Sequence, residues 1–173
     1  MSGISVDVSV LLIKGIPEGL LVAWAIHLFT NTPLQFKKYA LLSLFYIVTT
    51  YLIRFLPITL GINTVLSLFV LTFAFQVVYK AGLNQVIRAV ISSVVVLILI
   101  AVSEVLNVVL LTVIFGRSQA EALFTSTDGL TRAVYSSPST IFMAMFLVLI
   151  YFILRYIRMK RNLGHGKDYT QAS

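Results

Sequence analysis

The stretch Leu83 to Phe115, LNQVIRAVISSVVVLILIAVSEVLNVVLLTVIF, decides the fold, because its 33 residues are almost entirely apolar and its only charged side chains are Arg88 and Glu104. As an α-helix it would be about 50 Å long, whereas the hydrocarbon core of a bilayer is about 30 Å thick. Two spans do not fit, since each would have about 16 residues and no turn signal separates them. The stretch therefore predicts one long helix that crosses a membrane and projects beyond it.

The composition of the whole chain indicates the same class. Hydrophobic residues make up 59%, charged residues 11%, and the mean hydropathy is +0.99, so a soluble fold would leave far more apolar surface than its core could hide. A length of 173 residues allows about five spans with short connections. We expect an all-α, polytopic transmembrane helix bundle in one domain over residues 1–160, with a short basic cytoplasmic tail at 161–173.

Four further apolar runs complete the five expected spans. Their approximate limits are residues 8–29, 39–56, 62–79 and 140–157. Asn31 or Thr32 is expected to cap the second helix, with Pro33 in its first turn, and Pro138 is expected in the first turn of the last helix.

The connection from Gly116 to Ser137 is expected to form short helical pieces over one end of the bundle. Ser118 and Glu121 have the spacing of a capping box, and Asp128 with Gly129 predicts a turn. The connection either covers the helix ends as a plain surface segment or acts as a ligand-sensing cap.

The basic residues predict the direction of insertion. With the C-terminus in the cytoplasm, nine Lys and Arg lie inside, and only Lys14, Arg54, Arg117 and Arg132 lie outside. We therefore interpret the net charge of +7 as a sign of membrane topology and not of nucleic-acid binding. The expected location is the cell membrane, with the N-terminus outside and the lipid bilayer as the first partner.

Residues for catalysis are scarce. The chain has no cysteine, and its only histidines are His27 and His165, so no thiolate nucleophile and no histidine-rich metal site is available. No serine elbow with a histidine base and no phosphate-binding glycine loop is present. We expect a protein that is not an enzyme and that has no cofactor and no metal.

The segment LLIKGIPEGLL, Leu11 to Leu21, interrupts the first apolar run with charges. In a continuous helix Lys14 and Glu18 are four residues apart and can neutralise each other, while Pro17 bends the helix. Alternatively the residues before Pro17 lie along the outer surface, and the span begins at Pro17 with Glu18 in its first turn. The sequence leaves both interpretations open.

Glu104 lies inside the long fourth helix, and Asn107 shares its face one turn later. An ionised carboxylate there must be protonated, paired or turned to a polar cavity. A lumen around Glu18, Arg54 and Glu104 would take up a small polar or cationic ligand or a proton; the alternative is a polar clamp between helices. The candidate partners of Glu104 are Lys14, Arg54, Asn63, Thr64 and Gln76, and the candidate site residues are Lys14, Glu18, Arg54, Asn63, Glu104 and Asn107.

The segment YLIRFLPITLGINTVLSLF, Tyr51 to Phe69, the Pro17-Glu18 start and the glutamate in a long fourth helix are similar to a known family. They resemble the membrane input domains of Gram-positive GHKL-type sensor histidine kinases, over about residues 10–160. The resemblance implies a sensor. No phospho-acceptor histidine region and no ATP-binding domain follow Arg161, and His165 in GHGK does not replace them, so the expectation is a stand-alone sensor or a partner-regulating subunit.

The expected function is therefore non-catalytic: sensing or binding a small ligand, or regulating a partner subunit. Two alternatives remain open, a substrate-binding membrane component of a multi-subunit importer and a small structural subunit of a larger membrane complex. A protein partner or a homo-oligomer is expected in each case. A sensor or importer needs a ligand-sized cavity beside Glu18 or Glu104, whereas a structural subunit needs these groups packed against protein.

Overall fold

The computed structural model describes residues 10–53, 60–80 and 82–165, and these residues form helices and no strand. All the helices named below lie within these ranges. In chain order the elements are η1 (Leu11–Gly15), α2 (Ile16–Thr30), α3 (Phe36–Ile53), α4 (Leu60–Tyr79), α5 (Leu83–Phe115), α6 (Arg117–Phe124), α7 (Gly129–Ser136) and α8 (Pro138–His165).

Five helical segments are long and apolar enough to cross a membrane, as the sequence predicts. Their limits are Leu11–Thr30, Phe36–Ile53, Ile62–Tyr79, Leu83–Phe115 and Gly129–Lys160. The prediction that Leu83–Phe115 is a single helix is confirmed, since α5 runs through all 33 residues. The last helix is longer than expected, because α8 begins at Pro138 and continues to His165.

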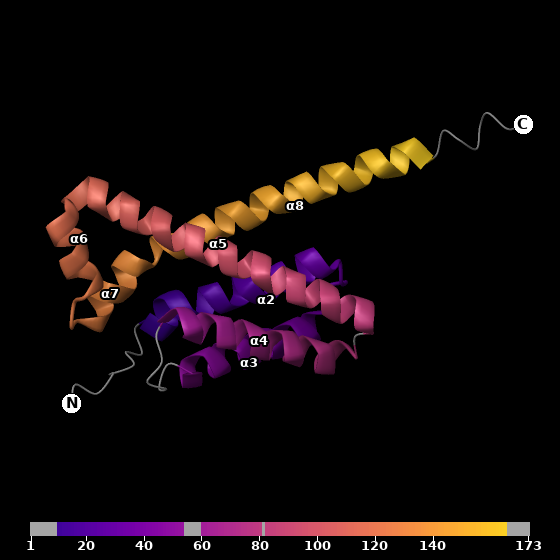
Figure 1. Ribbon diagram of the computed structural model, residues 1–173, viewed down its shortest axis with the longest axis horizontal. Helices are drawn as coiled ribbons and strands as arrows, with labels where there is room; N and C mark the ends of the chain where they lie inside the picture. Colours follow the sequence, from indigo (N-terminus) through magenta and orange to yellow (C-terminus); the bar gives the residue numbers. More distant parts are fainter. Residues whose placement is uncertain (1–9, 54–59, 81, 166–173) are drawn as a thin grey trace, which may run out of the picture.

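The helices form a bundle with two unlike ends. α2, α3, α4 and α5 pack side by side, and α8 crosses α5 and then leaves the bundle (Figure 1). α6 and α7 lie at one end, together with the beginning of α8. The turn between α4 and α5 lies at the opposite end, toward which the C-terminal half of α8 also runs (Figure 1).

The segment around Pro17 combines the two interpretations that the sequence leaves open. Residues 10–30 are continuously helical, so the residues before Pro17 are in line with α2. They form a π-helix, in which the amide of Ile16 donates to the carbonyl of Leu11, five residues earlier. Pro17 then stands in the first turn of α2, directly after the π-turn. The wider π-turn thus admits the proline within a continuous helix.

Two capping predictions are wrong. Asn31 does not start α3; it ends α2 in the left-handed conformation at φ 55°, where its amide donates to the carbonyl of His27. Asn tolerates this conformation better than most residues and so serves as a C-terminal cap. Ser118 and Glu121 form no capping box, because α6 starts after Gly116 and Glu121 accepts a bond from the Arg117 guanidinium instead.

The predicted turn at Asp128 and Gly129 is confirmed and is also a helix cap. The Asp128 carboxylate accepts the amides of Leu130 and Thr131 and the hydroxyl of Thr131. These hydrogen bonds, the Thr131 hydroxyl first among them, hold the pKa of the Asp128 carboxyl below its usual value. The α6–α7 connection is therefore ordered by its own polar groups.

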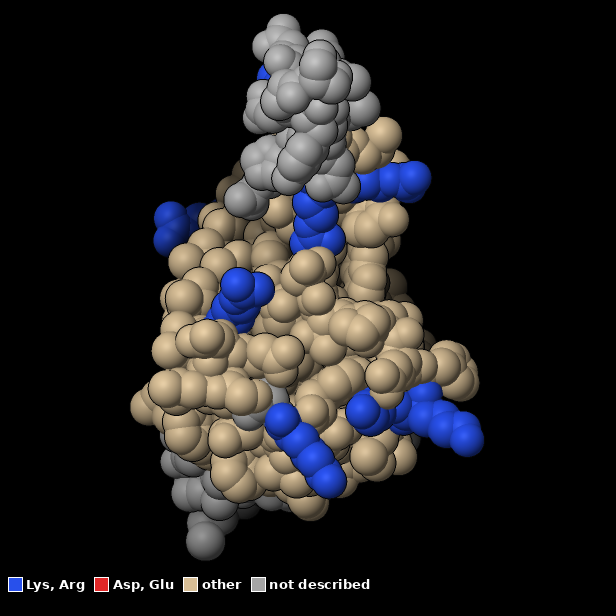
Figure 2. Space-filling model, turned by 90° about the vertical axis from the view of Figure 1, so that its right-hand side faces the viewer, with Lys and Arg blue, Asp and Glu red and all other residues tan. Residues whose placement is uncertain are grey.

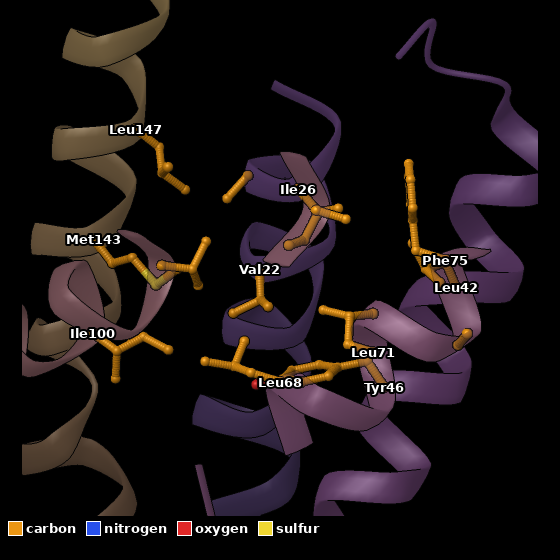
Figure 3. Packing of buried hydrophobic residues seen from close by; sticks show 14 residues of the cluster. Val22, Ile26, Leu42, Tyr46, Leu68, Leu71, Phe75, Ile100, Met143 and Leu147 are labelled. Carbon is orange, nitrogen blue, oxygen red and sulfur yellow. The ribbon is translucent and has the colours of Figure 1, made fainter. Parts of the chain in front are cut away.

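The core lies where α2 meets α3, α4, α5 and α8. Figure 3 shows Val22 and Ile26 of α2 between the side chains of α3 and α4 on one side and those of α5 and α8 on the other. Small residues on α5 also face inward: Ala89, Ser92 and Ser93 are buried, and the Ser93 hydroxyl bonds that of Thr72 of α4 at 2.7 Å. Small side chains of this kind let neighbouring helices pack closely.

Gly19 allows α2 and α3 to approach each other. A Cβ atom on Gly19 would collide with Cγ1 of Ile47 and lie 3.4 Å from Cδ1 of Tyr46. A Cβ on Gly15 would meet only its own helix, with Cδ1 of Leu11 at 3.1 Å. The two glycines therefore do not act as a pair, and Gly19 alone is a packing residue.

We predict that Gly19→Ala lowers the free energy of unfolding by about 1–3 kcal/mol, the usual cost of overpacking a contact between elements. Gly15→Ala is the matched control and should change it by less than about 0.5 kcal/mol, since the end of the Leu11 side chain can move aside. Denaturation in detergent followed by circular dichroism measures both. Equal stability of the two variants would show that α2 and α3 are not held at this contact.

Candidate functional site

An ion pair joins the first helix to the long one. The Lys14 ammonium of η1 lies 3.3 Å from Oε1 of Glu104 on α5. Lys14 is therefore a true partner of Glu104, as the list of candidates proposed. The Lys14 side chain is 14% exposed and that of Glu104 is 55% exposed. We expected the Glu104 side chain to be buried, and this expectation is wrong, because α5 turns the side chain toward the rim of the bundle.

A small cavity adjoins this pair. The residues that line it are Glu18, Ile100, Ser103, Glu104, Ser139, Thr140 and Met143. These residues come from α2, α5 and α8. We call this group, together with Lys14, the polar junction. The carboxylates expected around a lumen are indeed brought together.

The hydroxyls of the polar junction differ in their hydrogen bonds. Ser103 donates to the carbonyl of Leu99, and Ser139 donates to that of Ser136. The Thr140 side-chain oxygen is buried and has no hydrogen-bond partner in the structure. A buried hydroxyl without a partner costs about 1–3 kcal/mol, so a further group at this position would stabilise the fold.

The cavity is much smaller than the ligand-sized lumen that a sensor or importer of an organic molecule would need. Its volume is about 10 Å³, which is close to the space of one water molecule. A pocket for a small organic ligand measures some 300–1,000 Å³. The polar junction therefore accommodates one water-sized species in this structure.

The remaining candidate residues lie outside the cavity wall. Asn107 is buried on α5, where its amide nitrogen donates to the carbonyl of Tyr135 at 3.0 Å, so it ties α5 to α7. Asn63 is buried on α4, and its main-chain carbonyl accepts the Ser67 hydroxyl. Arg54 lies outside the described residues. Of the six expected residues, Lys14, Glu18 and Glu104 are thus brought together. Ser103, the neighbour of Glu104 in the chain, lies with them, as do Ser139 and Thr140, which the sequence did not single out as site residues.

A second polar cluster lies toward the opposite end and was missed by sequence reasoning. His27 is buried; its Nδ1 lies 2.7 Å from the carbonyl of Ala23, and its Nε2 lies 2.7 Å from the Tyr79 hydroxyl. Because a carbonyl only accepts, Nδ1 carries the proton, and neutral His27 then accepts the Tyr79 hydroxyl at Nε2. The Lys38 ammonium lies 4.9 Å from the centre of the Tyr79 ring. The cluster holds α2, α3 and α4 together and leaves the imidazole no free nitrogen.

Charge is distributed unevenly between the two ends. Figure 2 looks onto the end that is at the right of Figure 1, where Lys and Arg side chains stand out and no Asp or Glu is visible. The described basic residues of this end lie at the start of α3, just after α4, in the first turns of α5 and in the last turns of α8. They are Lys37, Lys38, Lys80, Arg88, Arg155, Arg158 and Lys160. The described acidic residues belong to α2, α5, α6 and the cap of α7, with Glu104 in the half of α5 nearer α6.

Comparison with known proteins adds no assignment: no family model, no curated protein and no solved structure matches this chain. Within residues 10–53, 60–80 and 82–165 the fold is all-helical, with five helices long and apolar enough to cross a membrane.

The strength of the ion pair can be measured by a double-mutant cycle on Lys14→Met and Glu104→Gln. We expect a coupling energy of about 0.5–1 kcal/mol, because Glu104 is half exposed and polar contacts between membrane helices are worth about that much. Unfolding of the two single variants and the double variant in detergent gives the value. A parallel cycle on the exposed Arg117–Glu121 pair of α6 is the control and should give less. A coupling near zero for Lys14 and Glu104 would contradict an anchoring role.

Proposed function

We propose that the chain is a non-catalytic, multi-pass protein of the cell membrane that binds a small cationic or polar species at the polar junction and reports its presence to a protein partner on the cytoplasmic side. The observation that carries this proposal is the course of α8. This helix begins beside the polar junction with Ser139 and Thr140 and runs without interruption to the basic end. Its 28 residues correspond to about 42 Å.

A continuous helix is a physical route for such a signal. A rigid element with one end in a site transmits a small displacement to its other end. The C-terminal half of α8 is suited to receive it, because from Val148 to Lys160 no side chain is buried in the chain. That half of α8 is therefore available to a partner. When the start of α8 moves at Thr140, few contacts within the chain hold the C-terminal half in place.

The uneven charge supports an orientation with the polar junction toward the outside. By the positive-inside rule, the end with Lys80 and Arg88 faces the cytoplasm, and α6 and α7 lie outside. Glu104 is 16 residues beyond Arg88 along α5, or about 24 Å. With Arg88 taken as the inner boundary of a hydrocarbon core about 30 Å thick, we infer that the ion pair lies near the outer boundary, where a solute can reach it.

The orientation is tested with single cysteines, since the chain has none of its own. Thr127→Cys, between α6 and α7, should react with a membrane-impermeant maleimide in intact cells. Asn84→Cys, at the start of α5, should react only after the cells are made permeable. The reverse pattern would overturn the orientation, and with it the outward location of the polar junction.

The transmission step is tested by a distance measurement between spin labels at Asn84→Cys on α5 and Arg158→Cys on α8. Glu104→Gln should shift this distance by about 1–2 Å or broaden its distribution, the size of helix movements that carry signals. Glu121→Gln removes a carboxylate from an exposed pair on α6 and is the matched control, with no shift expected. If Glu104→Gln behaves like the control, the pair only holds the helices together.

One observation favours the alternative of a structural subunit. Glu104 already has a protein partner in Lys14, and the adjoining cavity holds one water-sized species. The same small volume weighs against the importer alternative, because an imported organic substrate requires a larger pocket. The spin-label experiment separates the structural subunit from the sensor, since only the sensor couples Glu104 to the end of α8.

A further inference from the structure

We infer that a groove at the turn between α4 and α5 is a binding site for the headgroup of an anionic phospholipid. The inference goes beyond the proposed function and takes from it only the location in a membrane. We call this groove the turn groove, and the residues that line it are Tyr79, Lys80, Gly82, Leu83, Asn84 and Gln85.

The end of the molecule that holds the turn groove carries positive charge without acidic neighbours. Figure 2 shows Lys and Arg side chains on this face and no Asp or Glu. Among the described residues the ion pairs are Lys14–Glu104 and Arg117–Glu121, and neither includes a basic residue of this end. The charge of this end therefore suits an anionic partner, such as the anionic lipids that attract Lys and Arg to a membrane surface.

The turn groove lies at the level of the chain where lipid headgroups are expected. α4 ends at Tyr79 and α5 begins at Leu83, and both helices are long and apolar enough to cross a membrane. A turn between two such helices lies at the boundary between hydrocarbon and water, where Tyr is also enriched. Basic pockets between membrane helices at this boundary bind the headgroups of anionic lipids.

The turn groove has the room and the mixed surface that a phospholipid needs. It is open, its volume is about 740 Å³, and its surface is polar and apolar in similar measure. Lys80, Asn84 and Gln85 are exposed, so their N–H groups can turn toward a phosphate. The side chain of Leu83, which is 77% exposed, offers an apolar contact to an acyl chain. A free phosphate ion would make no use of Leu83, and for this reason we commit to the lipid.

Tyr79 gives the turn groove a fixed wall. Its hydroxyl lies 2.7 Å from Nε2 of His27, and its ring is stacked on that of Phe75 with the ring centres 4.8 Å apart. The Lys38 ammonium lies 4.9 Å from the centre of the Tyr79 ring, so α3 brings a second positive charge beside this wall. A wall that is already ordered lowers the entropic cost of binding.

The backbone of Lys80 is a further reason to assign a role to its side chain. Lys80 has φ 48°, in the left-handed region that Gly and Asn adopt more readily than Lys. Asn31, the other described non-glycine residue with a positive φ, is of the type that this conformation favours. A lysine in this conformation bears a cost that Asn would avoid, and such outliers point to a functional constraint.

The test measures lipid binding to the purified full chain in a neutral detergent by native mass spectrometry. The probes are dioleoyl phosphatidylglycerol, which is anionic, and dioleoyl phosphatidylcholine, which has the same acyl chains and no net charge. The wild type should bind the anionic lipid about tenfold more tightly, since at least two cations face one extra negative charge. Equal binding of the two lipids would overturn the inference.

Lys80→Asn should weaken binding of the anionic lipid about fivefold, the effect of one Lys near an anionic lipid surface, and leave phosphatidylcholine binding unchanged. Because Asn suits the left-handed backbone, this variant keeps the turn. Lys38→Gln is the second variant of the site and should weaken binding by a similar factor. Unchanged binding of the anionic lipid in both variants would contradict the assignment.

Lys160→Gln is the matched control. It removes one positive charge from the same end of the molecule, but from the last turns of α8, which Figure 1 shows apart from the turn between α4 and α5. This variant should bind phosphatidylglycerol as the wild type does. An equal loss in Lys80→Asn and Lys160→Gln would reduce the effect to diffuse attraction and overturn the site.

Glycerol phosphate, which has the charged group without the acyl chains, distinguishes the lipid from a soluble phosphate. At the concentration of the lipid it should neither bind nor displace phosphatidylglycerol. Equally tight binding of glycerol phosphate would mark a site for a soluble phosphate and overturn the lipid assignment.

The outcome is distinguishable from that of the proposed function. If phosphatidylglycerol is not preferred but Glu104→Gln still shifts the end of α8, sensing stands and the lipid site is wrong. If the lipid binds at the turn groove and α8 does not respond, the lipid site stands and sensing is wrong.

Discussion

The arrangement of the helices depends on one electrostatic requirement: a charge on an apolar helix needs an opposite charge nearby. Lys14 and Glu104 stand 90 positions apart in the chain and meet at 3.3 Å. Each alone would be costly to keep among apolar side chains, whereas the pair offsets much of that cost. Their contact joins η1 to α5. α2 continues from this point into the core, where its apolar side chains pack against α5.

The other polar groups of this end follow from the same contact. The start of α8 and the helix α7 pack around η1 and α5, and Asn107 adds a hydrogen bond from α5 to the main chain of α7. The π-turn of η1 belongs to this arrangement, because it carries Lys14, three residues before Pro17, without breaking the helix. One local change, the wider π-turn of η1, thus accommodates Pro17 together with Lys14 and Glu18 in a continuous helix.

The sequence predicts well what depends on the length of apolar runs and poorly what depends on contacts between distant residues. The 33-residue helix is predictable, because neither a turn signal nor a second charge cluster divides it. Asn31 is misread because the residue types that start helices overlap with those that end them, and only its backbone angle decides. Ser139 and Thr140 look like the ordinary start of a helix after Pro138. Their role in the cavity appears only when α8 is placed against Glu18 and Glu104, which no local pattern reveals.

The exposure of Glu104 is the strongest reason to regard the polar junction as more than a clamp. A pair that serves only to hold helices would be best buried on both sides, so that no solute competes with it. Here the Lys14 side chain is 14% exposed, whereas that of Glu104 is 55% exposed. In a bilayer, an exposed carboxylate that faced lipid would be costly, unless water or a partner protein covered it.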